Sequence, residues 1–246
     1  MQTPFRFLMI GSITIFLGGS LSAQAGSQFR PALLAPGPRS LVNLINAESL
    51  MKRGQENGLV MFQCGVSQLG RAYSAITFRG TENTQALSKE FLDQIDRAEF
   101  LPAKRDNKPQ SVLLHGTLMY AVIDGKPRIR IFLNQEEADL KQGNDFVAPQ
   151  LILDYGTKLK RIVWPGRAGS NNGTVAMDYS ISATGDITKL RTSYEEPKGL
   201  GFASEVIRGT REAPFIPAFR NGRPATCTFT LPFLFKSRIG PNWTTG

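Results

Sequence analysis

The chain has 246 residues and a formal net charge of +9, from 29 lysines and arginines against 20 aspartates and glutamates. The basic residues are scattered and form no recognised nucleic-acid motif, so the composition gives nucleic-acid binding no support. With one histidine, two cysteines and no Cys-x-x-Cys, His-Glu-x-x-His or phosphate-binding glycine loop, we expect no metal, no cofactor and no enzyme activity.

The N-terminal segment is typical of a secretory signal. Residues 1–25 carry Arg6 as their only charge, an apolar run over residues 7–21 and the small-x-small cleavage site Ala23-Gln24-Ala25. The run is about 15 residues long, shorter than the roughly 20 that a membrane-spanning helix needs. We therefore expect cleavage, export and no membrane span in the mature chain, with an uncleaved anchor as the alternative. Residues 26–39 are expected to form a short linker.

The first half predicts a helix followed by a strand-strand-helix-strand unit. Ser40 and Gly54 are suited to cap and end the first helix, and Thr84 or Asn83 to cap the second. Alternation indicates the strands, and apolar spacings of three and four indicate the helices. The expected elements are a helix over residues 41–51, strands over 58–66 and 72–78, a helix over 84–98, a basic loop at 104–108, a strand over 110–123 and an extra strand over 128–131.

The second half predicts the same order of elements. They are a strand over residues 174–182, a strand from Ile187, a short helix over 202–208 and a final strand over 225–235, followed by a tail at 237–246. Glycines around the helix shorten it, because each costs about 1 kcal/mol relative to alanine. We expect an α+β fold with one domain over residues 40–135, a linker over 136–170 and a second domain over 171–236.

The two halves read as copies of one unit. Residues 58–120 superimpose on residues 173–235 at a constant offset of 115 positions without a gap. The shared glycines and prolines mark turns, which are constraints of a fold rather than of composition. We therefore predict two β-β-α-β copies, each an antiparallel sheet with a helix on one face and its own core. The identities are Gly58/Gly173, Val60/Val175, Ser67/Ser182, Gly70/Gly185, Thr77/Thr192, Ala98/Ala213, Phe100/Phe215, Pro102/Pro217, Ala103/Ala218 and Pro109/Pro224.

Two cysteines in an exported protein raise the question of a disulfide. Cys64 and Cys227 each alternate with apolar residues, so each is expected on the apolar face of its own copy. Separate cores would hold them too far apart to bond. We expect two free, buried thiols, unless the copies exchange segments or pack closely.

The order of motifs in the second copy resembles the C-terminal domain of TonB-type energy transducers. The resemblance rests on Gly173-x-Val175, Ser182-x-x-Gly185, Phe215-x-Pro217, Asn221-Gly222-x-Pro224 and Leu231-Pro232-Phe233. The first copy carries a weaker version of it, with Gly58-x-Val60, Ser67-x-x-Gly70, Phe100-x-Pro102 and Asn107-Lys108-Pro109. Together the copies cover about half the chain.

The resemblance implies a periplasmic protein whose last strand pairs with an extended segment of a cell-envelope protein, such as an outer-membrane protein. The long proline-rich arm of the family is missing, which puts energy transduction in doubt. The extra strand after the first copy, with Arg128 and Arg130, would cover that copy's edge. The second copy's edge is the better candidate, unless the linker or the other copy occupies it. Its residues are Ala225, Thr226, Thr228, Thr230, Leu231 and Phe233.

A second hypothesis is a binder or enzyme for a small anionic ligand in a cleft between the copies. Arg220, Arg223 and Lys104 would hold the anion. His115, the only histidine, has no nucleophile motif or metal-binding partner, so we expect an ordinary residue of the sheet surface.

Overall fold

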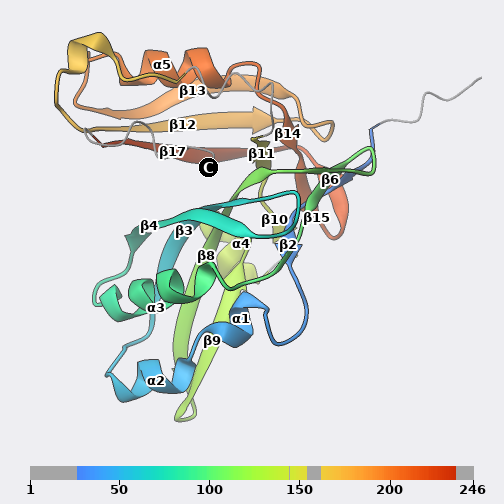
Figure 1. Ribbon diagram of the computed structural model, residues 1–246, viewed down its shortest axis with the longest axis vertical. Coiled ribbons are helices and arrows are strands. Elements are labelled where there is room, and N and C mark those ends of the chain that lie inside the picture. Colours follow the sequence, from blue (N-terminus) through green and yellow to red (C-terminus); the bar gives the residue numbers. More distant parts are fainter. Residues whose placement is uncertain (1–26, 144, 154–161, 237–246) are drawn as a thin grey trace, which may run out of the picture.

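The computed structural model describes residues 27–143, 145–153 and 162–236. Helices and mostly antiparallel sheets make up this part of the chain, so the predicted α+β class is confirmed (Figure 1). The expected signal at residues 1–25 and the tail at 237–246 lie outside the described residues. Among the described helices, none has both the length and the apolar character needed to cross a bilayer.

The first sheet has β3 (Gly58–Val66) between β4 (Ala72–Gly80) and β8 (Val112–Ile123), close to the predicted bounds. The helix α3 (Gln85–Ile95) covers one face of this sheet. Its buried Phe91 packs against Phe62 of β3, with ring centroids 4.5 Å apart and the rings tilted by 37°. The apolar spacing of the helix therefore seals the first core, as the sequence predicts.

The other edge of β8 is covered from within the chain. The strand β9 (Lys126–Phe132) pairs with residues 117–123 of β8, which confirms the predicted extra strand. The short strand β11 (Gln150–Ile152) pairs with Val112 and Leu113 at the start of β8. Between them, β9 and β11 occupy both ends of the β8 edge.

The second sheet has β12 (Gly173–Ile181) between β13 (Ile187–Glu196) and β17 (Cys227–Phe235). The helix α5 (Phe202–Thr210) lies on one face, two residues longer than expected. Tyr179 is buried beneath it and donates a hydrogen bond to the Thr210 hydroxyl at 2.7 Å. Two apolar clusters are buried, one under each helix, and each includes residues of the other half: Ile216 and Phe219 in the first and Leu113 in the second.

The described part of the segment between the halves, residues 136–143, 145–153 and 162–170, contains helical turns and paired strands where a linker was expected over residues 136–170. We call this part the junction. It contains α4 (Glu137–Gln142), β10 (Phe146–Val147), β11 and a 3-10 turn at Gly166–Ala168. β11 lies between β8 of the first half and β14 (Phe215–Ile216) of the second. One hydrogen-bonded sheet, in the order β14-β11-β8-β3-β4, therefore joins the halves.

The N-terminal stretch expected as a linker over residues 26–39 also pairs with the body. The strand β1 (Phe29–Arg30) pairs with β6 (Ala103–Arg105), and β2 (Leu33–Leu34) pairs with β5 (Phe100–Leu101). The buried Gln150 amide of β11 accepts from the Ala32 N–H at 2.7 Å and donates to the Ala32 carbonyl at 2.9 Å. Strands of two residues are too short for alternation to show, which is why the sequence did not indicate them.

These short pairings occur in both halves. In each pairing, the strand that precedes β3 or β12 differs by 117 positions between the halves, as from Phe29 to Phe146. The strand with which it pairs differs by 115 positions, as from Arg105 to Arg220. The loop expected at residues 104–108 is a hairpin of β6 with β7 (Lys108–Gln110), matched by β15 (Ala218–Arg220) with β16 (Arg223–Ala225). The matching pairs are Phe29↔Arg105 with Phe146↔Arg220, and Leu34↔Phe100 with Leu151↔Phe215.

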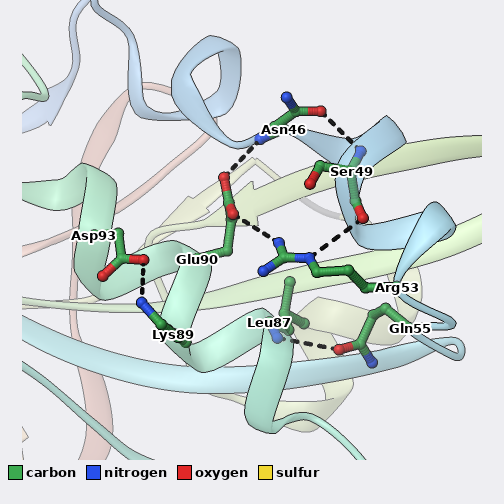
Figure 2. A network of polar contacts seen from close by, with 8 residues as sticks. All are labelled: Asn46, Ser49, Arg53, Gln55, Leu87, Lys89, Glu90 and Asp93. Atoms are coloured by element: carbon green, nitrogen blue, oxygen red, sulfur yellow. Dashed lines mark hydrogen bonds and ion pairs between the residues drawn. The ribbon is translucent and has the colours of Figure 1, made fainter.

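The helix expected over residues 41–51 is broken into α1 (Leu41–Leu44) and α2 (Ala47–Lys52). Figure 2 shows the cause: the Asn46 N–H donates to Glu90 of α3 at 3.1 Å, and the Asn46 side chain accepts from Ser49 and caps α2. Glu90 is buried, and Arg53 neutralises its charge through an ion pair in which Nη2 lies 2.8 Å from the Glu90 Oε2. This polar network fixes the short helices on α3 and interrupts the expected single helix.

The cap of α3 also differs from the expectation. Thr84 occupies the cap position but makes no capping hydrogen bond with its side chain. Instead, the Gln55 side chain accepts from the Leu87 N–H at 3.0 Å, also drawn in Figure 2, and donates to the Asn83 carbonyl. A residue distant in sequence does the work of the local cap, so local sequence signals alone miss it.

We expect Gly70→Ala and Gly185→Ala to destabilise the protein by about 3 kcal/mol each. Both glycines have positive φ, and an added Cβ would lie 2.1 Å from the Phe100 carbonyl oxygen and 2.2 Å from that of Phe215, respectively. Gly125→Ala is the matched control, because its φ is also positive but nothing lies within 4 Å of the added Cβ. Urea denaturation should give a loss of about 1 kcal/mol for this control, and equal losses for all three would contradict the steric argument.

Candidate binding edge of the second sheet

The edge strand β17 is paired on one side only within the described part of the chain. Its register with β12 runs from Cys227 opposite Ile181 to Phe235 opposite Gly173. The corresponding strand of the first half, β8, is paired on both sides. The unpaired side of β17 is therefore the difference between two otherwise similar sheets.

Side-chain contacts on β12 show which backbone groups of β17 point to this unpaired side. The Ala176 carbonyl accepts from the Ser193 hydroxyl at 3.1 Å, and the Ser180 carbonyl accepts from the Thr188 hydroxyl at 3.0 Å. Both donors belong to β13, so these two carbonyls point away from β17. In an antiparallel ladder, the residues opposite them point their own N–H and C=O groups the other way, toward the free side.

The residues opposite Ala176 and Ser180 are Pro232 and Thr228. A proline fits only where its missing N–H is not needed by the ladder, which agrees with this assignment. By the same alternation, the free side of β17 offers the N–H groups of Thr228, Thr230 and Leu234 and four carbonyls, those of these residues and of Pro232. The free edge is thus intact except for one missing donor.

The side chains of β17 divide between an apolar and a polar face. Phe229, Leu231 and Phe233 are buried beneath α5. On the opposite face, the Thr228 hydroxyl contacts that of Ser180 at 2.9 Å, and Thr230 donates to the Asp178 carboxylate at 2.9 Å. A strand added at this edge would therefore meet an apolar surface on one side and hydroxyl groups on the other.

Asp178 anchors the polar face. Burial alone would raise the pKa of its carboxyl, but hydrogen bonds from Arg191, Ser193 and Thr230 and the charge of Arg191 outweigh that effect. The pKa of Asp178 therefore lies below its ordinary value. The carboxylate stays charged and holds β13, β12 and β17 together on the side opposite the helix.

The residues predicted for the edge do not all lie on it. Thr228 and Thr230 lie on β17 with exposed side chains, and their backbone groups are directed outward. Leu231 and Phe233 are buried, and their backbone groups point to β12. Ala225 ends β16 and pairs with Ala218, while the exposed Thr226 lies between the strands. The sequence reads as one strand here because the β16 hairpin arm continues directly into β17.

The two cysteines lie in different environments, and both are free in the structure. Cys64 is fully buried in the first core, and burial raises the pKa of its thiol to about 12. Cys227 is half-buried rather than buried, and burial with the nearby Glu136 charge raises its pKa to about 12. Both thiols are thus held protonated and are poor nucleophiles.

His115 is buried, which corrects the expectation of a residue on the sheet surface. Its Nε2 lies 3.3 Å from the Gln63 Oε1, and burial lowers the pKa of the imidazole to about 3. Gln63 also lines a pocket with Leu113 and with Leu153, which follows β11. The histidine is therefore a neutral interior group.

The cations proposed for an anion site do not converge on such a site. Arg220 makes a two-pronged ion pair with Asp139 of α4, at 2.6 and 3.2 Å, and its guanidinium lies 4.5 Å from the centre of the Phe146 ring. These contacts hold β15 against the junction, and Asp139 neutralises the charge of Arg220. Lys104 and Arg223 lie on the separate strands β6 and β16, and neither lines the pocket next to Gln63.

Comparison of the chain with protein-family models, with curated proteins and with solved structures finds no match. Within the described residues, no group of three or more histidines, cysteines or carboxylates could hold a metal ion. The function must therefore be argued from the geometry of the chain itself.

We expect hydrogen exchange to alternate along β17. The amides of Phe229, Leu231 and Phe233 should be protected by the ladder with β12, while those of Thr228, Thr230 and Leu234 should exchange rapidly. Exchange measured by NMR on the chain without residues 1–25 distinguishes the two sets. Slow exchange at all six positions would mean that a segment of the chain itself covers the edge.

We expect His115→Gln to flatten the acid dependence of stability. The folded pKa of His115 lies below the ordinary 6.5, so the unfolded chain binds the extra proton and the wild type loses stability as pH falls from about 6.5 toward 3. The loss relative to the variant should reach roughly 1 kcal/mol per pH unit. Urea denaturation of both proteins between about pH 7 and pH 4 measures it, and parallel curves would contradict the assignment.

Proposed function

We propose that the two halves are tandem copies of one unit similar to the C-terminal domain of TonB-type transducers. The support is the recurrence of β3, β5, β6, β7 and β8 as β12, β14, β15, β16 and β17 at the sequence offset of 115. The arm pairings before each unit support it further, since Arg105 stacks on Phe29 as Arg220 stacks on Phe146. Each copy then begins with its arm, at about residue 29 and about residue 146.

On this basis, we propose that the protein is an exported, periplasmic, non-enzymatic adaptor that binds an extended segment of a cell-envelope protein along β17. The observation that carries the proposal is the free side of β17, with its outward N–H and C=O groups, while the equivalent side of β8 is filled. Main-chain hydrogen bonds supply the affinity of such strand addition. We propose an outer-membrane protein as the partner, because the domain that this unit resembles binds outer-membrane receptors.

Pro232 limits how the partner binds. It removes one donor from the free side, so the partner strand obtains N–H groups at Thr228, Thr230 and Leu234 only. The best-supplied register is centred on Thr228 and Thr230, where donors and acceptors alternate without a gap. Proline also discourages long, indiscriminate edge pairing, which favours a short segment over an extended sheet as partner.

We expect Thr228→Pro and Thr230→Pro to abolish partner capture while the protein stays folded. Each removes a free-side donor that the ladder with β12 does not use, as Pro232 already does. Leu231→Pro is the matched control, because it removes a donor inside the ladder and should unfold the second sheet. Affinity capture from envelope extract with residues 26–246, checked by circular dichroism, measures both effects. Undiminished capture by folded Thr228→Pro would exclude strand addition at β17.

A further inference from the structure

The face of the first sheet that is turned away from α3 carries a cluster of cations among apolar side chains. Cross-strand partners share a face of a sheet, so the register identifies the members of this cluster. We call it the basic face. Its pairs are Met61↔Arg79, Met119↔Arg130, Ala121↔Arg128 and Ile123↔Lys126.

The cations of the basic face are exposed, and only Arg79 has an acidic side chain near it among the described residues, Glu137 of α4. Within the described part of the chain, no hydrogen bond or ion pair engages Arg79, Lys126, Arg128 or Arg130. Glu137 of α4 forms an ion pair with Lys141 at 2.6 Å, and this contact, with a smaller effect from the charge of Arg79, lowers the pKa of its carboxyl. Asp124 in the β8–β9 turn, Glu56 before β3 and Glu82 after β4 are further acidic residues at this end of the sheet. The acidic residues lie at the rim, while the cross-strand partners of the four cations on the face itself are uncharged, so positive charge is in excess there.

The apolar side chains between the cations are also left without a core. Met61 and Met119 are half-buried and belong to neither apolar cluster, and Ile123 is 53% exposed. Ile123 ends β8 at the turn to β9, and Figure 1 shows this hairpin reaching beyond the helices at one end of the molecule. Exposed apolar groups of this size mixed with cations fit an amphipathic partner better than a purely polar one.

Blunting of the sheet edge does not explain the whole face. Arg128 and Arg130 lie on the edge strand β9, where charge discourages pairing with other chains. Arg79 lies on β4, at the opposite side of the same sheet, with β3 and β8 between. The cations therefore span the sheet rather than follow one edge.

We propose that the basic face docks on a membrane surface that contains anionic lipids. Arginine and lysine beside such a surface each contribute attraction to the headgroup phosphates, while Ile123 and the two methionines enter the boundary between headgroups and acyl chains. Long basic side chains extend toward phosphate while their stems cover apolar surface. The site is separate from the β17 edge and does not depend on the function proposed for that edge.

The test is co-sedimentation of residues 26–246 with vesicles of phosphatidylglycerol and phosphatidylethanolamine, beside vesicles of phosphatidylcholine alone. This chain keeps every described residue and omits the apolar N-terminal run, which would bind lipid by itself. We expect binding to the anionic vesicles only, weakened by high salt. Arg128→Thr with Arg130→Thr keeps strand-forming residues and should reduce partitioning about 25-fold.

Two further variants keep the test decisive. Lys52→Thr with Arg97→Thr removes the same charge from the helical side, and should leave partitioning within about twofold apart from the effect of net charge. Arg79→Thr, on a different strand, should reduce it about fivefold. Equal binding by the Arg128/Arg130 and the Lys52/Arg97 variants would overturn the proposal. So would equal binding to neutral vesicles, or retention by RNA or polyglutamate without any binding to vesicles.

Discussion

The pairing of β11 with strands of both halves is the constraint on which the rest of the structure depends. Three residues, Gln150–Ile152, supply hydrogen bonds to β8 on one side and to β14 on the other. The Gln150 side chain extends this by satisfying both backbone groups of Ala32, which would otherwise be buried without partners. The junction therefore fixes the orientation of the second sheet, and with it the direction in which the free side of β17 faces.

The two sheets solve the problem of the exposed edge in different ways. The first covers β8 with a hairpin strand that carries arginines, and with β11. In the second, one side of β17 has no partner among the described residues, Pro232 removes one donor from that side, and Thr230 on the polar face donates to Asp178. An unpaired edge that lacks one backbone N–H donor suits selective, reversible pairing.

The sequence predicted the elements whose pattern is local and long. The strands β3, β8, β9 and β12 and the helix α3 follow from alternation or helical spacing, because one face of each is buried. The two-residue arms, the break at Asn46 and the Gln55 cap depend on partners that are distant in sequence, so no local pattern indicates them. The orientation of the Thr228 and Thr230 backbone groups could have been predicted from the sequence. Pro232 has no N–H, so it must face the unpaired side of the strand, and residues two and four positions away face the same side. The burial of His115 could not be predicted, because it depends on how parts of the chain that are distant in sequence pack on that face, as Leu153 does beside Gln63.

On the proposed tandem reading, β11 has a further consequence for the history of the chain. It is the leading arm of the second copy, yet it closes the edge of the first. After a duplication of this kind, one strand, β11, is needed by the sheets of both copies. Loss of the second would uncover β8, and loss of the first would deprive β11 of half its partners. The two copies are therefore expected to be inherited together. On this reading, the first copy can diverge toward a structural role and the second toward binding.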